Sequence, residues 1–140
     1  MEKLPTLPVM PLSCRPSLVL AGWGAFGKTK DNRLLRYQMH DIWGLHLYTY
    51  RAHLMINGER VELSPGTASI TPPHSCLEWH LRGFSRHACA LFTFPSTAEA
   101  GVRLPCLLRL GEKFAHFVSL VERMGAAMPV NRSRAEAMLW

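Results

Sequence analysis

Residues 54–74 read LMINGERVELSPGTASITPPH, and this stretch contains three turn signals in close succession. The Asn-Gly pair at 57–58 separates two apolar runs and tolerates positive φ at both residues, which makes it the strongest short hairpin signal. The Pro-Gly pair at 65–66 gives a second turn, and the Pro-Pro pair at 72–73 stops the strand that follows. The stretch therefore predicts three short strands joined by tight turns.

Alternation of side chains with a period of two residues, as expected of β-strands, is found on both sides of this stretch. Side chains alternate between two faces over residues 45–51 and 77–82, and residues 86–94 resume the pattern after a glycine. Residues 17–21 are apolar and short enough for a first strand. Short strands at this spacing predict a sandwich or barrel, so the expected fold is mainly β, a jelly-roll barrel.

Beyond the barrel the period changes to that of a helix. Apolar residues at helical spacing predict an amphipathic helix, and they are Phe114, Phe117, Val118, Val121 and Met124. Ser133 and Glu136 have the spacing of a capping box, which predicts a second helix cut short at Trp140. We therefore expect an arm and barrel over residues 1–103, a helical segment over 104–140, and a longer parent protein.

Composition excludes several classes of protein. The chain has 140 residues, of which 48% are hydrophobic, and its formal net charge is +6. No run of about 18 apolar residues and no charged-then-apolar leader is visible, so we expect a cytoplasmic protein without membrane contact. The four cysteines form no Cys-x-x-Cys pair, which excludes a zinc ribbon or a thioredoxin-like site.

The spacing of Gly66 and Pro72 resembles the second cupin motif, which is Gly, five residues, Pro, one residue, Gly, two residues and a metal-binding His. His74 stands at the second Gly of that motif, and Leu77 stands at its His. The first motif, His-x-His followed by Glu, is missing, and His46 is its only remaining ligand. The resemblance therefore implies a cupin-like barrel that holds no metal.

The order of barrel, helix and capped helix resembles the N-terminal domain of AraC-type transcriptional regulators. This resemblance covers about residues 17–140. It implies a cupin barrel that binds a small effector, dimerising helices, and DNA binding only through a helix-turn-helix domain that would follow Trp140. It implies no catalytic residue and no cofactor. Two alternatives stay open, namely a metal-dependent cupin enzyme and a dimerisation module without a ligand.

An effector is expected inside the barrel, where small-molecule sites form in this class of fold. Alternation selects most of the candidates, with the choice of inward face left open, and the resemblance adds Arg36, near where sugar-binding members have an arginine. The expected ligand-binding residues are Arg36, His46, Tyr48, Tyr50, Leu77, Trp79, Ala88 and Ala90. The competing interpretation is core packing for the apolar residues and His46, and a surface ion pair for Arg36.

Two further expectations concern assembly and control. The helical stripe is expected to be only partly covered by the barrel, which would leave an apolar face for a second copy in a homodimer. Effector binding is expected to reorganise the N-terminal arm and the loop around Trp23. With Arg36 as the anchor of the effector, an Arg36→Ala variant would lose the response to effector.

Overall fold

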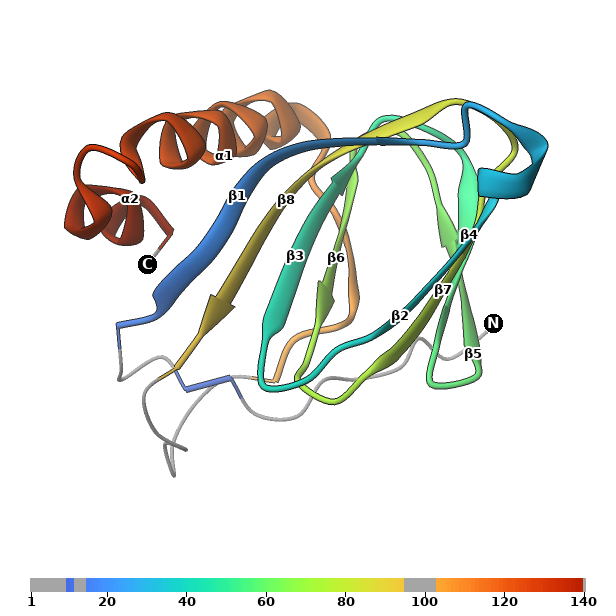
Figure 1. Ribbon diagram of the computed structural model, residues 1–140, viewed down its shortest axis with the longest axis horizontal. Coiled ribbons are helices and arrows are strands. Elements are labelled where there is room, and N and C mark those ends of the chain that lie inside the picture. Colours follow the sequence, from blue (N-terminus) through green and yellow to red (C-terminus); the bar gives the residue numbers. More distant parts are fainter. Residues whose placement is uncertain (1–9, 12–14, 95–102, 140) are drawn as a thin grey trace.

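The computed structural model describes residues 10–11, 15–94 and 103–139. The strands are β1 (Ser17–Phe26), β2 (Leu34–Gln38), β3 (Trp43–Tyr48), β4 (Ala52–Ile56), β5 (Glu59–Leu63), β6 (Thr67–Thr71), β7 (Cys76–His80), β8 (Ser85–Thr93) and β9 (Leu107–Arg109). The helices are α1 (Phe114–Ala127) and α2 (Arg132–Leu139), and short 3-10 turns lie at Lys30–Asn32 and Gly111–Lys113. Figure 1 shows the strands as a barrel with both helices on one side of it.

The strands form two antiparallel sheets with the orders β1-β8-β3-β6-β9 and β2-β7-β4-β5. The first strand pairs with the eighth, the second with the seventh, the third with the sixth and the fourth with the fifth. This nested pairing is that of a jelly roll, in which two Greek keys close a double sheet. The expected fold, mainly β with a cupin-like jelly-roll barrel and two C-terminal helices, is confirmed.

The Asn-Gly turn between β4 and β5 follows the predicted hairpin chemistry. Asn57 and Gly58 have φ angles of 50° and 84°, which is the left-handed region that a two-residue hairpin turn requires. The Asn57 Oδ1 atom also accepts a hydrogen bond of 2.8 Å from the Cys76 backbone amide. The turn is thereby fixed to the beginning of β7, the next strand of the same sheet.

Two strands differ from the sequence expectation. β2 was not among the strands predicted from the sequence, because only two of its residues are aliphatic. β9 lies in the segment expected to be helical, yet it pairs with β6 at the sheet edge. A strand of three to five residues at an edge carries too little periodicity to be recognised locally, and its partner strand decides its conformation.

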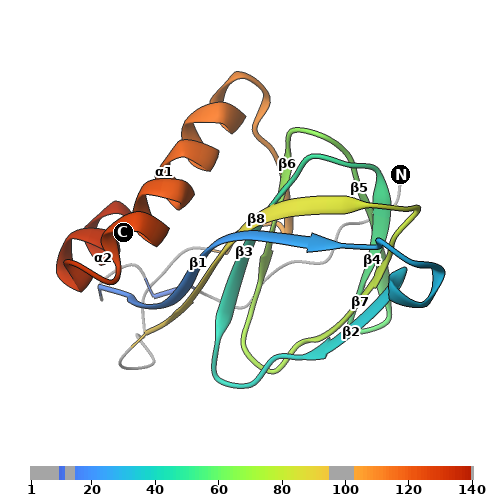
Figure 2. The ribbon, with the colours of Figure 1, turned by 45° about the horizontal axis from the view of Figure 1, so that its top comes forward.

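Helix α1 lies across the outer face of the first sheet, over β1 and β8 (Figure 2). Val121 and Met124 are buried against that face, at 1% and 2% exposure. A Cβ atom added to Gly125 would come within 2.7 Å of the Ala21 carbonyl oxygen, so glycine permits this close approach of helix and strand. The assignment of Val121 and Met124 to a dimer interface is therefore wrong, because the sheet covers them.

Helix α2 begins at Arg132, two residues before the position that the predicted capping box requires. The Asn131 side chain accepts a hydrogen bond of 3.1 Å from the Arg134 amide and acts as the N-cap. Ser133 is then already inside the first turn, so the predicted capping box with Glu136 is wrong. The Arg132 Nη1 atom donates a 3.0 Å bond to the Leu18 carbonyl oxygen, which ties this helix to β1.

Most of the expected N-terminal arm, residues 1–9 and 12–14, lies outside the described residues. Met10, which is described, is buried in the barrel core. Among the described residues, no helix has the length and apolar character needed to cross a membrane.

Candidate ligand-binding cavity

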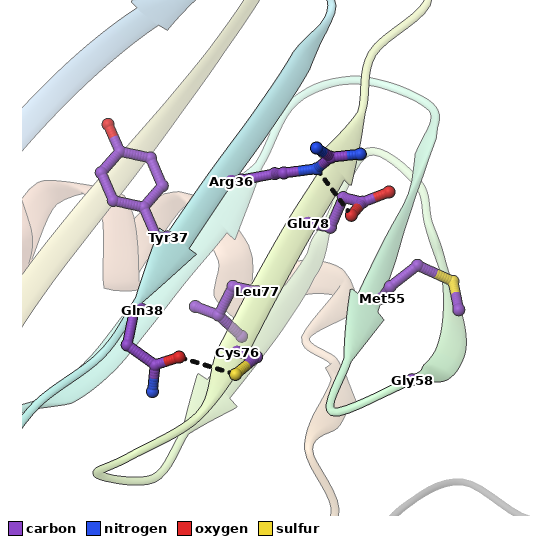
Figure 3. Close-up of a pocket in the computed structure, with 8 residues that line it drawn as sticks. All are labelled: Arg36, Tyr37, Gln38, Met55, Gly58, Cys76, Leu77 and Glu78. Carbon is purple, nitrogen blue, oxygen red and sulfur yellow. Dashed lines mark hydrogen bonds and ion pairs between the residues drawn. The ribbon is translucent and has the colours of Figure 1, made fainter.

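Arg36 lies on the outer surface of the barrel. Its side chain is 72% exposed and forms a 3.0 Å ion pair with Glu78 of the neighbouring strand β7. Figure 3 shows Arg36 and Tyr37 on opposite sides of β2, as the alternation of a strand requires. The expectation that Arg36 holds a ligand inside the barrel is therefore wrong, because Leu35 and Tyr37 occupy the inward positions of β2.

A cavity of about 210 Å³ lies inside the barrel, between the two sheets. It is called the barrel cavity below. Its lining residues are Leu20, Phe26, Leu35, Tyr37, Met39, His46, Trp79, His87, Cys89 and Leu91. Strands β1, β3 and β8 of one sheet and β2 and β7 of the other contribute all of these residues except Met39. No lining residue is an acid, a lysine or an arginine, so neutral and mostly apolar side chains surround the space.

His46 is the polar centre of this cavity. Its ring lies 5.2 Å from the rings of both Trp79 and His87, edge to face in each case. The side chain is 6% exposed, and its Nδ1 atom has no hydrogen-bond partner among the described residues. Burial, together with the nearby His87, lowers the pKa of His46 to about 3, so the ring is neutral at pH 7.

His87 is the second histidine of the cavity, and it already has a partner. The Tyr50 hydroxyl lies 2.7 Å from His87 Nδ1. Burial lowers the pKa of His87 to about 4, which keeps this ring neutral as well. Tyr50 therefore acts from behind the cavity wall, where it fixes the orientation of His87.

Tyr48 and Trp79 form a hydrogen-bonded pair in the barrel core. The Trp79 Nε1 atom donates a 3.2 Å bond to the Tyr48 hydroxyl, which also lies 2.7 Å from the Ser69 hydroxyl. Tyr48 is fully buried, and burial raises its pKa well above the ordinary value. The indole N–H of Trp79 is thus satisfied within the protein, and Trp79 offers the cavity only its ring.

The structure brings only part of the predicted site together. His46 and Trp79 line the barrel cavity, whereas Tyr48 and Tyr50 support its walls and Leu77 is buried in the barrel core. Tyr48, Tyr50 and Leu77 are therefore not lining residues of the cavity.

Ala88 and Ala90 face the opposite way from the cavity. They are fully buried in the cluster that includes the helices, while His87, Cys89 and Leu91 line the cavity. The prediction for the two alanines is wrong because both faces of β8 are buried, so apolar character does not reveal which face is inward. The alternation of β8, counted from the other face, would have found the three lining residues.

The mouth of the cavity lies between the edge strands of the two sheets. Leu20 of β1 and Tyr37 of β2 are 51% and 52% exposed, although both line the cavity. Gly22 pairs with Cys89 across β1 and β8, so its missing side chain lies on the cavity face, and a Cβ atom there would meet nothing within 4 Å. The cavity thus has an apolar opening and unfilled space along β1.

The donor set of this cavity predicts a protein without bound transition metal. In the part of the chain that the structure describes, no group of three or more His, Cys, Asp or Glu side chains is placed to hold a metal ion. A stable site needs three or four such ligands converging on one point. We expect elemental analysis of the purified protein to find zinc, iron, nickel and manganese well below one equivalent. Near one equivalent, lost on His46→Leu substitution, would contradict this prediction.

No protein-family model and no curated protein matches the sequence. Among solved structures, the chain is similar to the EutQ protein of Clostridium difficile, with 14% identity, a TM-score of 0.43, and coverage of 52% of this chain and 55% of that one. A cupin protein from Bacteroides fragilis has 12% identity and a TM-score of 0.44, with coverage of 73% and 93%. The chain thus spans about half the length of the first of these proteins. The fold assignment follows from the strand order described above.

Proposed function

We propose that this chain is the effector-binding domain of an AraC-type transcriptional regulator, and that a small molecule occupies the barrel cavity without a metal ion. The mostly apolar barrel cavity, with His46 among its lining residues, carries the proposal. A buried polar atom without a hydrogen bond costs about 1–3 kcal/mol. His46 Nδ1 lacks such a bond among the described residues, so this side of the cavity is suited to a hydrogen-bonding ligand rather than to permanent closure.

The position of the helices supports a sensing role. Strand β1 contributes Leu20 to the cavity and Ala21 to the cluster under the helices. On the helix side, the Trp23 Nε1 atom donates a 3.0 Å bond to Glu122 of α1. One strand therefore contacts both the ligand space and the helices.

This shared strand gives a physical route from ligand to helices. A ligand shifts a conformational equilibrium only by its difference in affinity for the two states. A molecule that displaces Leu20 on one face of β1 also moves the helix contacts of its neighbours on the other face. The proposed effector response therefore depends on β1, and not on Arg36.

The genomic reading frame tests the regulator assignment. If the proposal is correct, the frame continues past Trp140 into two helix-turn-helix motifs. A frame that continues into another kind of domain would contradict the assignment to AraC-type regulators and would leave the cavity unexplained.

Small molecules that co-purify with the protein test the binding assignment separately. We expect mass spectrometry of the wild-type protein, purified from its own host, to detect a bound small molecule. The same molecule should be absent from a Cys89→Trp variant, which fills the cavity, and present in Arg36→Ala, whose side chain lies outside. Equal recovery from all three proteins would contradict binding in the barrel cavity.

A further inference from the structure

The residues that line the barrel cavity indicate the chemical class of its ligand. Its walls contain no charged side chain, and both of its histidines are neutral rings in a buried setting. A charged ligand would lose its hydration there without gaining an opposite charge, which is strongly unfavourable. An ionised sugar acid or carboxylate therefore does not match the cavity.

The volume of the cavity matches a ligand with one ring. The cavity measures about 210 Å³, and an apolar cavity of about 150 Å³ in another protein accommodates benzene. Sites for drug-sized molecules run from about 300 Å³ upward. A molecule with one ring and a few further atoms therefore fills this space, whereas a two-ring molecule would extend into the opening between Leu20 and Tyr37.

The wall is suited to the face and edge of an aromatic ring. Phe26 and His87 stack with centroids 4.9 Å apart, and Trp79 lies nearly parallel to His87 at 6.0 Å. Rings arranged in this way offer both edges and faces to a further ring, and such contacts are favourable beyond simple burial. A polyhydroxylated sugar would instead need several polar partners, and this wall offers few.

His46 is the polar residue of the wall toward which a ligand can place a hydrogen-bonding group. Trp79 Nε1 is bonded to Tyr48, and His87 Nδ1 is bonded to Tyr50. His46 Nδ1 is the buried side-chain nitrogen without a partner among the described residues. His46 lines the cavity, so the wall matches a ligand with a hydrogen-bonding group and an otherwise apolar surface.

We propose that the barrel cavity binds an uncharged molecule of a single aromatic ring that carries one hydrogen-bonding group, and that this group pairs with His46. The inference rests on the proposed effector-binding function and specifies the ligand class of the same site. The molecule enters between Leu20 and Tyr37, where the edges of the two sheets leave an apolar opening.

Three probes of equal ring size test the proposal on the whole chain. Phenol carries one neutral hydrogen-bonding group, toluene carries none, and benzoate carries a charge. We expect calorimetry to show that phenol binds about fivefold more tightly than toluene and at least about tenfold more tightly than benzoate, since a tenfold difference is about 1.4 kcal/mol. Phenol should also shift the imidazole nitrogen resonances of His46 in nuclear magnetic resonance spectra.

Two variants locate the bound phenol. His46→Phe keeps a ring but removes the nitrogen, so the preference for phenol over toluene should disappear while toluene still binds. Arg36→Ala is the matched control, because its side chain lies outside the barrel, and it should leave all three affinities unchanged. The comparison of probes on the wild-type protein needs no variant, so it holds even where a variant folds poorly.

The outcomes separate this inference from the function on which it rests. Benzoate binding more tightly than phenol, or phenol shifting no resonance of His46, would overturn the ligand class and leave the effector-binding function standing. A phenol preference that survives His46→Phe would overturn the role of His46. If no probe binds and no small molecule co-purifies with the protein, both the ligand class and the effector-binding function fail.

Discussion

Lowering the pH from 6.5 to about 4 is expected to reduce the free energy of unfolding by roughly 3–5 kcal/mol through two histidines alone. Burial, with His87 nearby, lowers the pKa of His46 from 6.5 to about 3, and burial lowers that of His87 to about 4. This loss is a large fraction of the stability of a domain, which is about 5–15 kcal/mol.

The sign follows from which state takes up protons. Below pH 6.5 the unfolded chain protonates both histidines, whereas the native protein keeps His87 neutral down to about pH 4 and His46 down to about pH 3. Acid therefore favours the unfolded state. The stability is fully present above pH 6.5 and falls as the pH drops through this window, by up to about 1.4 kcal/mol per pH unit for each histidine.

Urea unfolding followed by circular dichroism over this pH range measures the slope. His46→Leu removes one of the two titrating groups and should reduce the histidine contribution by about half. Ser119→Ala, at an exposed position of α1, is the control substitution and should leave the slope unchanged. A His46→Leu variant with the wild-type slope would show that His46 is not buried as a neutral ring.

Val121→Glu is expected to prevent folding of the domain. Val121 is 1% exposed and lies in the cluster between α1 and the outer sheet face. A carboxylate at this position would be buried without a partner, and such a change costs several kcal/mol. Far-ultraviolet circular dichroism and the urea midpoint should show an unfolded or severely destabilised protein.

Ser119→Glu is the matched control for this substitution. Ser119 lies on the exposed side of the same helix, so the same new charge should leave the urea midpoint nearly unchanged. A Val121→Glu protein that folds normally but sediments as a monomer, where the wild type is a dimer, would show that the stripe is an interface instead. The homodimer itself stays a prediction, now carried by the half-buried Phe114, Phe117 and Val118.

The sequence alone determined those features that depend on neighbouring residues. The Asn-Gly turn at 57–58 requires positive φ at both residues, and the structure has both. The strands on either side of it, β6 after the Pro-Gly turn, and helix α1 follow from local turn chemistry and periodicity. Together, these elements were sufficient to predict a mainly β barrel followed by helices.

Other features depended on contacts between distant segments. β2 and β9 are edge strands whose conformation is set by pairing with β7 and β6. The choice of Asn131 as the N-cap also lay beyond the sequence, because Ser133 carries an equally good capping side chain.

In the candidate site, too, some features follow from the sequence and others only from the tertiary structure. Alternation of side chains with a period of two residues shows that a strand has two faces, but only the packing of the sheets decides which face is inward. In β8 both faces are buried, so Ala88 and Ala90 meet the helices while His87 and Cys89 meet the cavity. Arg36 has an inward neighbour on each side and therefore points outward to Glu78. Sequence determined the alternation, and only the tertiary structure decided which side encloses the ligand space.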